Sequence, residues 1–320
     1  MKQAVNILML GGARRVSMAR HIIKAGARHD LNVNLFSYEL TDEVPIAEVA
    51  TVIKGARWSD NNLMEHLHDT IKDNGIDILL PFVDPSVEVA LRYVHNDSSV
   101  WTPGSNINMV AIMFNKIAAD ETFRKFAIPI PPNPKHETVV GEIIAKPCFG
   151  SASKGIRILT ADEYYHLAKT DKGNDFLFQK YFDKRKEYTV DCYVDHTGKV
   201  VCAIPRIRLD IAGGEVTDTV TVRDIEIEQL SIEILNRLQL TGPITLQFLR
   251  ELYPSGHLGP AMLMEINPRF GGGAVCAIHA GADIPYFMFG DYLGKPMQPC
   301  DIWLEGTRIC RYQQEVVFYT

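Results

Sequence analysis

The chain has 320 residues, of which 46% are hydrophobic and 22% are charged, and its formal net charge is −6 at pH 7. This length allows two or three compact units, each with its own hydrophobic core. The acidic balance argues against nucleic acid as an obligate partner, and no apolar run reaches the roughly 18 residues that a membrane span needs. The N-terminal residues lack a signal-peptide pattern, so we expect a cytoplasmic protein. Six scattered cysteines without a CxxC pair predict reduced thiols rather than a zinc site.

Strands and helices alternate along the first third of the chain. Residues 5–10 form a near-continuous apolar run of the kind buried in a parallel sheet. Gly11-Gly12-Ala13 then turns the chain into a helix through about Ala25, with Gly26 beyond its end. The pattern predicts further strands at 33–36, 50–53 and 76–81, and further helices at 63–74 and 87–93. This alternation predicts a small doubly wound α/β domain that ends near residue 110.

Two features of this first domain have more than one interpretation. Strand, glycines and helix open a Rossmann-like dinucleotide site, but G-x-G-x-x-G is missing and Arg14 and Arg15 replace small residues. A structural turn is therefore favoured, with an anion held at the helix N-terminus by either arginine as the alternative. Asp84 and Glu88 follow a strand C-terminus, where open sheets bind ligands, although a helix cap is the favoured interpretation of Asp84.

Lysines and a glycine- and serine-rich hairpin in the middle of the chain predict a phosphate site. A helix expected at 110–126 carries Lys116, and the proline-rich connector 128–134 marks a module boundary. Lys146 lies on a predicted strand, 142–147, directly before a loop at 149–155 whose backbone N–H groups can fold over phosphates. Lys146 and Lys154 add positive charge for the same anion. The loop is not a Walker A motif, because no G-x-x-x-x-G-K-[ST] leads into a helix.

From residue 156 onward, the sequence predicts antiparallel strands and one long helix. The helix is expected at 225–238. Arg206 and Arg208 are two residues apart on an extended segment and therefore face one side. Such a pair suits a substrate carboxylate or phosphate, with a solvated edge strand as the alternative. The strands are expected at 156–159, 176–181, 187–194, 199–204, 216–222, 245–249, 258–266 and 307–312.

The most specific stretch of the sequence runs from Met262 to Gly273, MLMEINPRFGGG. Glu265 and Asn267 are alternate residues of a predicted strand, so both side chains project from one face. Gln247, on the neighbouring strand, adds a third oxygen, and hard oxygen ligands of this kind suit Mg²⁺. A simple pairing of Glu265 with Arg269 is the alternative, but it leaves Gln247 and the three glycines unexplained. We therefore predict a magnesium site here.

In this order, the motifs resemble the ATP-grasp superfamily over nearly the whole chain. Within it, the sequence is most similar to the synthetase domain of the carbamoyl phosphate synthase large subunit and to the pyrrolysine-pathway amide ligase. The resemblance rests on LLPFVDP at 79–85, the helix with Lys116, the glycine-loop hairpin, a hinge at 179–182 and EINPR at 265–269. It implies an α/β and α+β protein, with an N-terminal Rossmann-like preATP-grasp domain (1–110) before a two-part ATP-grasp fold. The two parts are a linking helix with a lid subdomain (111–183) and a C-terminal subdomain with the metal site (184–320).

The resemblance also implies roles for matching residues. Lys116 and Lys146 hold the phosphates of ATP, Lys146 nearest the α-phosphate, and Lys146 and Arg269 serve catalysis. Arg269 contacts the γ-phosphate and the developing acyl phosphate, and with Arg206 and Arg208 forms the substrate side. Two Mg²⁺ ions, with Mn²⁺ as an alternative, bind Gln247, Glu265 and Asn267. The remaining nucleotide contacts are the loop residues Ser151, Ser153, Lys154 and Gly155, the adenine hinge Gln179, Lys180, Tyr181 and Phe182, Glu187 at the ribose, and Met264 against the adenine.

Three positions depart from the family pattern: Gln179 replaces a usual acidic residue, Asp218 a frequent lysine, and Thr245 an arginine typical of D-alanine ligases. The predicted activity is that of an ATP-dependent carboxylate–amine ligase, which forms an amide through an acyl phosphate. The alternatives are a phosphotransferase or carboxylase-type enzyme that acts on a non-amine acceptor, and a non-catalytic ATP-binding protein. The expected partners are a small-molecule carboxylate and an amine, with neither nucleic acid nor membrane, and a homodimer is the family-level expectation.

Overall fold

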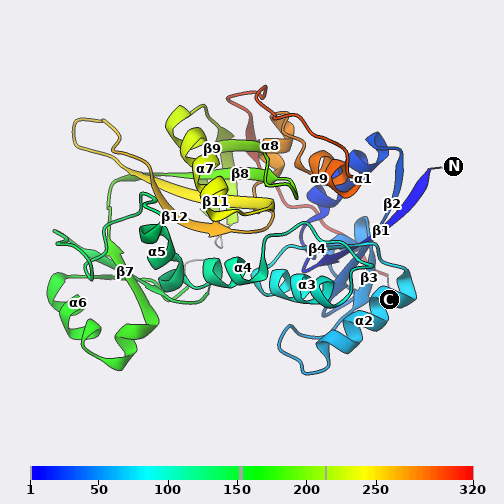
Figure 1. The fold of residues 1–320 in the computed structure, drawn as a ribbon, viewed down its shortest axis with the longest axis horizontal. Coiled ribbons are helices and arrows are strands. Elements are labelled where there is room, and N and C mark those ends of the chain that lie inside the picture. Colours follow the sequence, from blue (N-terminus) through cyan, green and yellow to red (C-terminus); the bar gives the residue numbers. More distant parts are fainter. Residues whose placement is uncertain (1, 151–153, 213–214, 320) are drawn as a thin grey trace.

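The computed structural model describes residues 2–150, 154–212 and 215–319 and contains three β-sheets flanked by helices (Figure 1). The first sheet is parallel, with the order β3-β2-β1-β4. It confirms the predicted α/β start, because helices α1 (Val16–Arg28), α2 (Leu63–Asn74) and α3 (Asp84–Asn96) alternate with its strands. The strands are β1 (Gln3–Leu10), β2 (Leu31–Glu39), β3 (Thr51–Lys54) and β4 (Ile78–Pro81), and a 3-10 turn, η1 (Pro45–Glu48), precedes β3.

Helix α1 extends further than the sequence predicts. Gly26 lies inside the helix rather than beyond its end, and it faces β2. A Cβ atom at this position would lie 2.2 Å from Cγ2 of Val33, so only glycine lets the helix approach the sheet this closely. The glycine is therefore a packing residue and not a helix stop.

The helix expected at 110–126 is wrong, because the structure has two helices there. These are α4 (Ile107–Phe114) and α5 (Lys116–Lys125). Asn115 between them is extended, and its side chain accepts hydrogen bonds from the backbone N–H groups of Ile117 and Ala118. This N-cap starts a new helix and places Lys116 at its first position.

The second sheet is a small antiparallel one, with the order β6-β5-β7. It consists of β5 (Ile143–Pro147), β6 (Arg157–Leu159) and β7 (Phe176–Lys180), and it packs on α6 (Ala161–Ala168) through a core that includes Tyr164 and Phe178. A 3-10 turn, η2 (Asp171–Asp175), leads into β7. The expected lysine-bearing strand and its returning hairpin partner are thus confirmed.

The third sheet has six strands in the order β12-β11-β8-β9-β10-β13. One face is apolar and is covered by α7 (Ile225–Leu238) and α5, with Val190, Leu246 and Phe248 fully buried. The opposite face carries polar side chains, as the alternation in the sequence predicts. The strands are β8 (Arg185–Val194), β9 (Val200–Ala212), β10 (Glu215–Thr221), β11 (Gly242–Glu251), β12 (Met262–Asn267) and β13 (Arg308–Cys310).

The C-terminal helices return to the first sheet. Helices α8 (Val275–His279) and α9 (Ile284–Tyr292) follow β12, and α9 lies beside α1 (Figure 1). Met288 and Phe289 of α9 belong to the same buried cluster as β1, so one core joins the two ends of the chain. The described cysteines are free thiols, and among the described residues no helix is long and apolar enough to cross a bilayer. The boundaries at residues 110 and 183 stay a prediction.

Candidate active site

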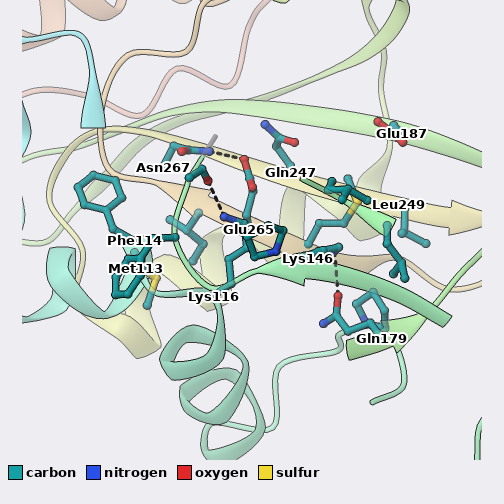
Figure 2. Close-up of a pocket in the computed structure, with 18 of the residues that line it drawn as sticks. Met113, Phe114, Lys116, Lys146, Gln179, Glu187, Gln247, Leu249, Glu265 and Asn267 are labelled. Carbon is teal, nitrogen blue, oxygen red and sulfur yellow. Dashed lines mark hydrogen bonds between the residues drawn. The ribbon is translucent and has the colours of Figure 1, made fainter. Parts of the chain in front are cut away.

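A cavity of about 530 Å³ is lined by side chains from all three parts of the fold (Figure 2). The third sheet forms one wall, the lysine-bearing hairpin and the hinge form the facing wall, and α3 and α4 contribute Asp84, Glu88, Met113 and Phe114. The cavity brings together the following site residues expected from the sequence: Lys116, Lys146, Lys154, Gln179, Lys180, Tyr181, Phe182, Glu187, Arg208, Gln247, Met264, Glu265 and Asn267.

Two lysines place positive charge opposite the third sheet in the cavity. Lys146 projects from β5, and its Nζ donates a 2.9 Å hydrogen bond to Oε1 of Gln179. Lys116, at the start of α5, donates a 2.6 Å hydrogen bond from Nζ to the backbone oxygen of Gly150 in the loop. Burial lowers the pKa of Lys146, the negative charge of Glu265 raises it, and the neighbouring Lys116 lowers it further. An anion such as a phosphate chain would relieve this crowding of positive charge.

Three oxygen-bearing side chains face the lysines from the third sheet. Gln247 lies on β11, which neighbours β12 as predicted, and the register sets it directly opposite Glu265; Asn267 follows two residues later. Figure 2 shows Asn267 bonded to Glu265, with an Nδ2–Oε1 distance of 2.8 Å. The pairing of Glu265 with Arg269 is therefore wrong, because Arg269 bonds to Asp84 and lies 3.4 Å from Oδ1 of Asn267. One carboxylate and two amide oxygens fit Mg²⁺ when phosphates or waters complete its octahedron.

A β-bulge places Met264 on this wall as well. Leu263 pairs with Phe248 and Glu265 with Gln247, so Met264 is an extra residue in β12. Strict alternation would turn Met264 away from the face that carries Glu265. Because the bulge shifts the register, both side chains line the cavity.

The opposite end of the cavity contains the hinge and a charged cluster. The backbone N–H of Lys180 donates to the oxygen of Pro132, which attaches the hinge to the proline connector. Glu187 accepts a 2.8 Å hydrogen bond from Nε of Arg185 and lies 3.6 Å from Arg208. Burial lowers the pKa of Arg208, and the charge of Glu187 opposes this shift. Arg185 was missed by the sequence reasoning, although it precedes Glu187 by two residues and thus shares its strand face.

Several expected site residues have other placements. Gly155 and Arg269 are not among the residues that line the cavity. Arg206 is also absent from the lining: only 2% of it is exposed, and its Nε lies 2.7 Å from Oδ2 of Asp191. It differs from Arg208, which reaches the cavity from the same strand. Ser151 and Ser153 lie outside the described residues.

Asp84 is not a helix cap, which corrects the favoured interpretation of this residue. It is the first residue of α3 rather than its N-cap, and it accepts a 2.6 Å hydrogen bond from Nε of Arg269. Phe270 stacks on Phe82 next to this ion pair, with ring centroids 5.8 Å apart. The residues directly after β12 therefore contact the first domain through an ion pair to α3 and an aromatic contact to the residue that follows β4.

Comparisons with known proteins agree with this fold. The family model described as "ATP-grasp in the biosynthetic pathway with Ter operon" matches residues 172–314. The biotin carboxylase domain of 2-oxoglutarate carboxylase from Hydrogenobacter thermophilus, solved with MgADP, ADP and bicarbonate, has a TM-score of 0.72 at 16% identity, covering 93% of this chain and 72% of that one. Biotin carboxylase from Campylobacter jejuni has a TM-score of 0.73 at 14% identity, covering 95% of this chain and 74% of that one. N5-carboxyaminoimidazole synthetase from Staphylococcus aureus, complexed with ADP, has a TM-score of 0.71 at 15% identity, covering 93% of this chain and 79% of that one. No curated protein sequence matches the chain.

Proposed function

We propose that this chain, which has the fold of the ATP-grasp superfamily, is an ATP-dependent ligase that joins a carboxylate to an amine. The observation that carries the proposal is the composition of the cavity described above. Two lysines from one wall face two amides and a carboxylate from the other, and Glu187 and the hinge lie at the far end. Positive charge and hard oxygen ligands in one cavity are what a metal–nucleotide complex requires.

ATP would lie along the cavity between the hinge and the oxygen ligands. The adenine would bind between the hinge 180–182 and Met264, and the ribose hydroxyls would bond to Glu187. Lys146 and Lys116 would hold the phosphates, with Lys154 reaching them from the loop. Gln247, Glu265 and Asn267 would hold Mg²⁺, which when bound neutralises phosphate charge. Two of the similar structures were solved with MgADP or ADP, which supports an adenine nucleotide as the ligand.

The reaction has two steps. An oxygen of the substrate carboxylate attacks the γ-phosphorus of ATP, the bond from that phosphorus to the bridging oxygen breaks, and ADP leaves. The amine nitrogen then attacks the acyl carbon, the C–O bond to phosphate breaks, and the nitrogen loses a proton as phosphate leaves. The lysines stabilise the charge of the transferring phosphoryl group, and the cavity must exclude water that would otherwise hydrolyse the acyl phosphate. A catalytic role of Arg269 requires its guanidinium to exchange Asp84 for the phosphoryl oxygens.

A carboxylase-type reaction is the second candidate. It is favoured by the similarity to two biotin carboxylases, one of which was solved with bicarbonate. Bicarbonate would then replace the organic acid in the first step, and the acceptor would gain a carboxyl group. Product mass distinguishes the two reactions, because carboxylation adds the mass of CO₂ to the acceptor, whereas ligation yields the sum of acid and amine less one water.

The metal assignment is tested by Glu265→Ala and Asn267→Ala. Acid-dependent ADP release, measured over a panel of carboxylate and amine pairs with Mg-ATP, should fall by at least roughly 100-fold in each variant. Glu233→Ala is the matched control, because this exposed carboxylate of α7 lies outside the cavity. Unimpaired turnover in both cavity variants would contradict the assignment. ATP binding without turnover under every substrate mixture would instead indicate a non-catalytic nucleotide-binding protein.

A further inference from the structure

A buried chain of polar contacts leads from Lys146 away from the cavity into α5. Oε1 of Gln179 accepts from Lys146, and Nε2 of Gln179 donates a 2.9 Å hydrogen bond to Oδ1 of Asp120. Gln179 is 2% exposed and Asp120 is 3% exposed, so solvent does not compete for these bonds. Figure 2 shows the amide of Gln179 directly below the ammonium group of Lys146. The cavity lysine is thus linked to a carboxylate outside the cavity lining.

Asp120 is itself firmly held. Its Oδ2 accepts a 2.9 Å hydrogen bond from Nε of Arg124 and a 3.2 Å hydrogen bond from Nδ2 of Asn133. Both carboxylate oxygens therefore face only donors. Asp120 is also one helical turn beyond Lys116, so α5 carries one phosphate-facing lysine and the anchor of the other.

The chemistry of the Gln179 amide fixes the direction of these hydrogen bonds. A carboxylate only accepts hydrogen bonds and an ammonium group only donates them. Gln179 therefore presents its NH₂ group to Asp120 and its oxygen to Lys146. The flipped amide would place NH₂ against the ammonium group and oxygen against the carboxylate, which are two repulsive contacts. The charge of Asp120 thus determines which end of Gln179 faces the cavity.

We propose that Asp120 is a positioning residue that acts through Gln179 to fix the Lys146 ammonium group where the nucleotide phosphates bind. The proposal rests on the nucleotide site proposed above. The relay replaces a direct carboxylate–lysine pair by a carboxylate, an amide and a lysine, so the anionic partner is one residue further from the cavity. Lys146 keeps an acceptor on one side and is free to meet phosphate on the other.

Exchange of the two functional groups tests the relay. In Asp120→Asn, the new amide must turn its oxygen to Arg124 and Asn133, so its NH₂ group faces Gln179 and forces that amide to flip toward Lys146. In Gln179→Glu, two carboxylates face each other across the 2.9 Å contact. The double variant restores a consistent order, because the new amide donates to the new carboxylate, which accepts from Lys146. We expect the MgADP dissociation constant to rise roughly 10- to 100-fold in each single variant and to return to within about 3-fold in the double variant.

Glu121→Gln is the matched control, since it removes an exposed carboxylate next to Asp120 on the same helix. MgADP binding is measured by titration calorimetry, and folding by circular dichroism. A double variant that binds as weakly as Gln179→Glu would overturn the relay, even if Asp120→Asn alone does not fold. Failure of the wild type to bind MgADP would count against the nucleotide site itself. The NMR signals of the Gln179 side-chain NH₂ group need no nucleotide, and identical shifts and exchange rates in wild type and Asp120→Asn would refute the relay in either case.

Discussion

Gly273→Ala should destabilise the fold by displacing a buried ion pair. A Cβ atom at this position would lie 2.7 Å from Cζ of Arg206 and 2.8 Å from each terminal nitrogen. The backbone itself tolerates alanine, because Gly273 is not among the positive-φ residues. Arg206 is only 2% exposed, and its guanidinium donates hydrogen bonds to Asp191 and Thr219, so it cannot move away without losing those partners. Breaking a buried pair of this kind costs about 3–5 kcal/mol.

Calorimetry measures this cost. At roughly 2 °C per kcal/mol for a large cooperative unit, Gly273→Ala should lower Tm by about 6–10 °C. The same substitution in an Arg206→Ala/Asp191→Ala background meets no guanidinium, and there its cost should fall below about 1 kcal/mol. This double-mutant cycle separates the ion pair from any general effect of the added methyl group. Equal losses of stability in the two backgrounds would refute the steric reasoning.

Two further predictions concern single contacts. Asn115→Ala removes the N-cap of α5 and should lower the free energy of unfolding by about 1 kcal/mol. It should also weaken MgADP binding, because Lys116 is the first residue of that helix. Asn115→Asp keeps an acceptor and is the control, and equal stability of the wild type and the alanine variant would contradict the role of the cap. The hydrogen bond to Asp291 raises the pKa of His196 above its ordinary 6.5. Protonated His196 therefore stabilises the folded state fully below about pH 6.5, and this stabilisation is lost as the pH rises through the folded-state pKa. The wild type should therefore resist urea slightly better than His196→Gln at about pH 5.5 and equally well at about pH 8.5. The difference should be small because the His196 side chain is 64% exposed. A difference that grows with pH would contradict the sign of this prediction.

Local patterns in the sequence predicted much of the fold and of the site. The apolar spacing of α7 gave its observed bounds, 225–238, because a helix that packs one face on a sheet must repeat its apolar residues every three to four positions. The alternation in β11 and β12 placed Gln247, Glu265 and Asn267 on one face, and the observed register confirms it. These successes share one cause: each depends on neighbours within a single element or on two strands joined by a short connection.

Contacts between distant segments were beyond such patterns. Asp84 and Arg269 are 185 residues apart, and nothing in either local sequence indicates that they pair. The break between α4 and α5 depends on the side chain of Asn115 turning back on the backbone, in a stretch whose composition would also support one continuous helix. Asp120 carries no sign of its link to Gln179, because Gln179 comes from β7 and Asn133 from the proline connector, and only Arg124 is a local partner.

Arg206 and Arg208 have different surroundings, which the alternation of side chains along a strand does not predict. The alternation correctly assigns both arginines to one face of β9, because residues two apart on a strand project from the same side. It contains no information on what covers each part of that face. The glycine segment after β12 lies against Arg206, where Gly271 and Gly273 leave room for Asp191 and for the guanidinium. Arg208 lies beyond that cover and meets Glu187 and Gln247 at the cavity. The glycines of the most specific motif therefore close over one arginine as well as following the metal ligands, and substrate contacts should be sought first at Arg208.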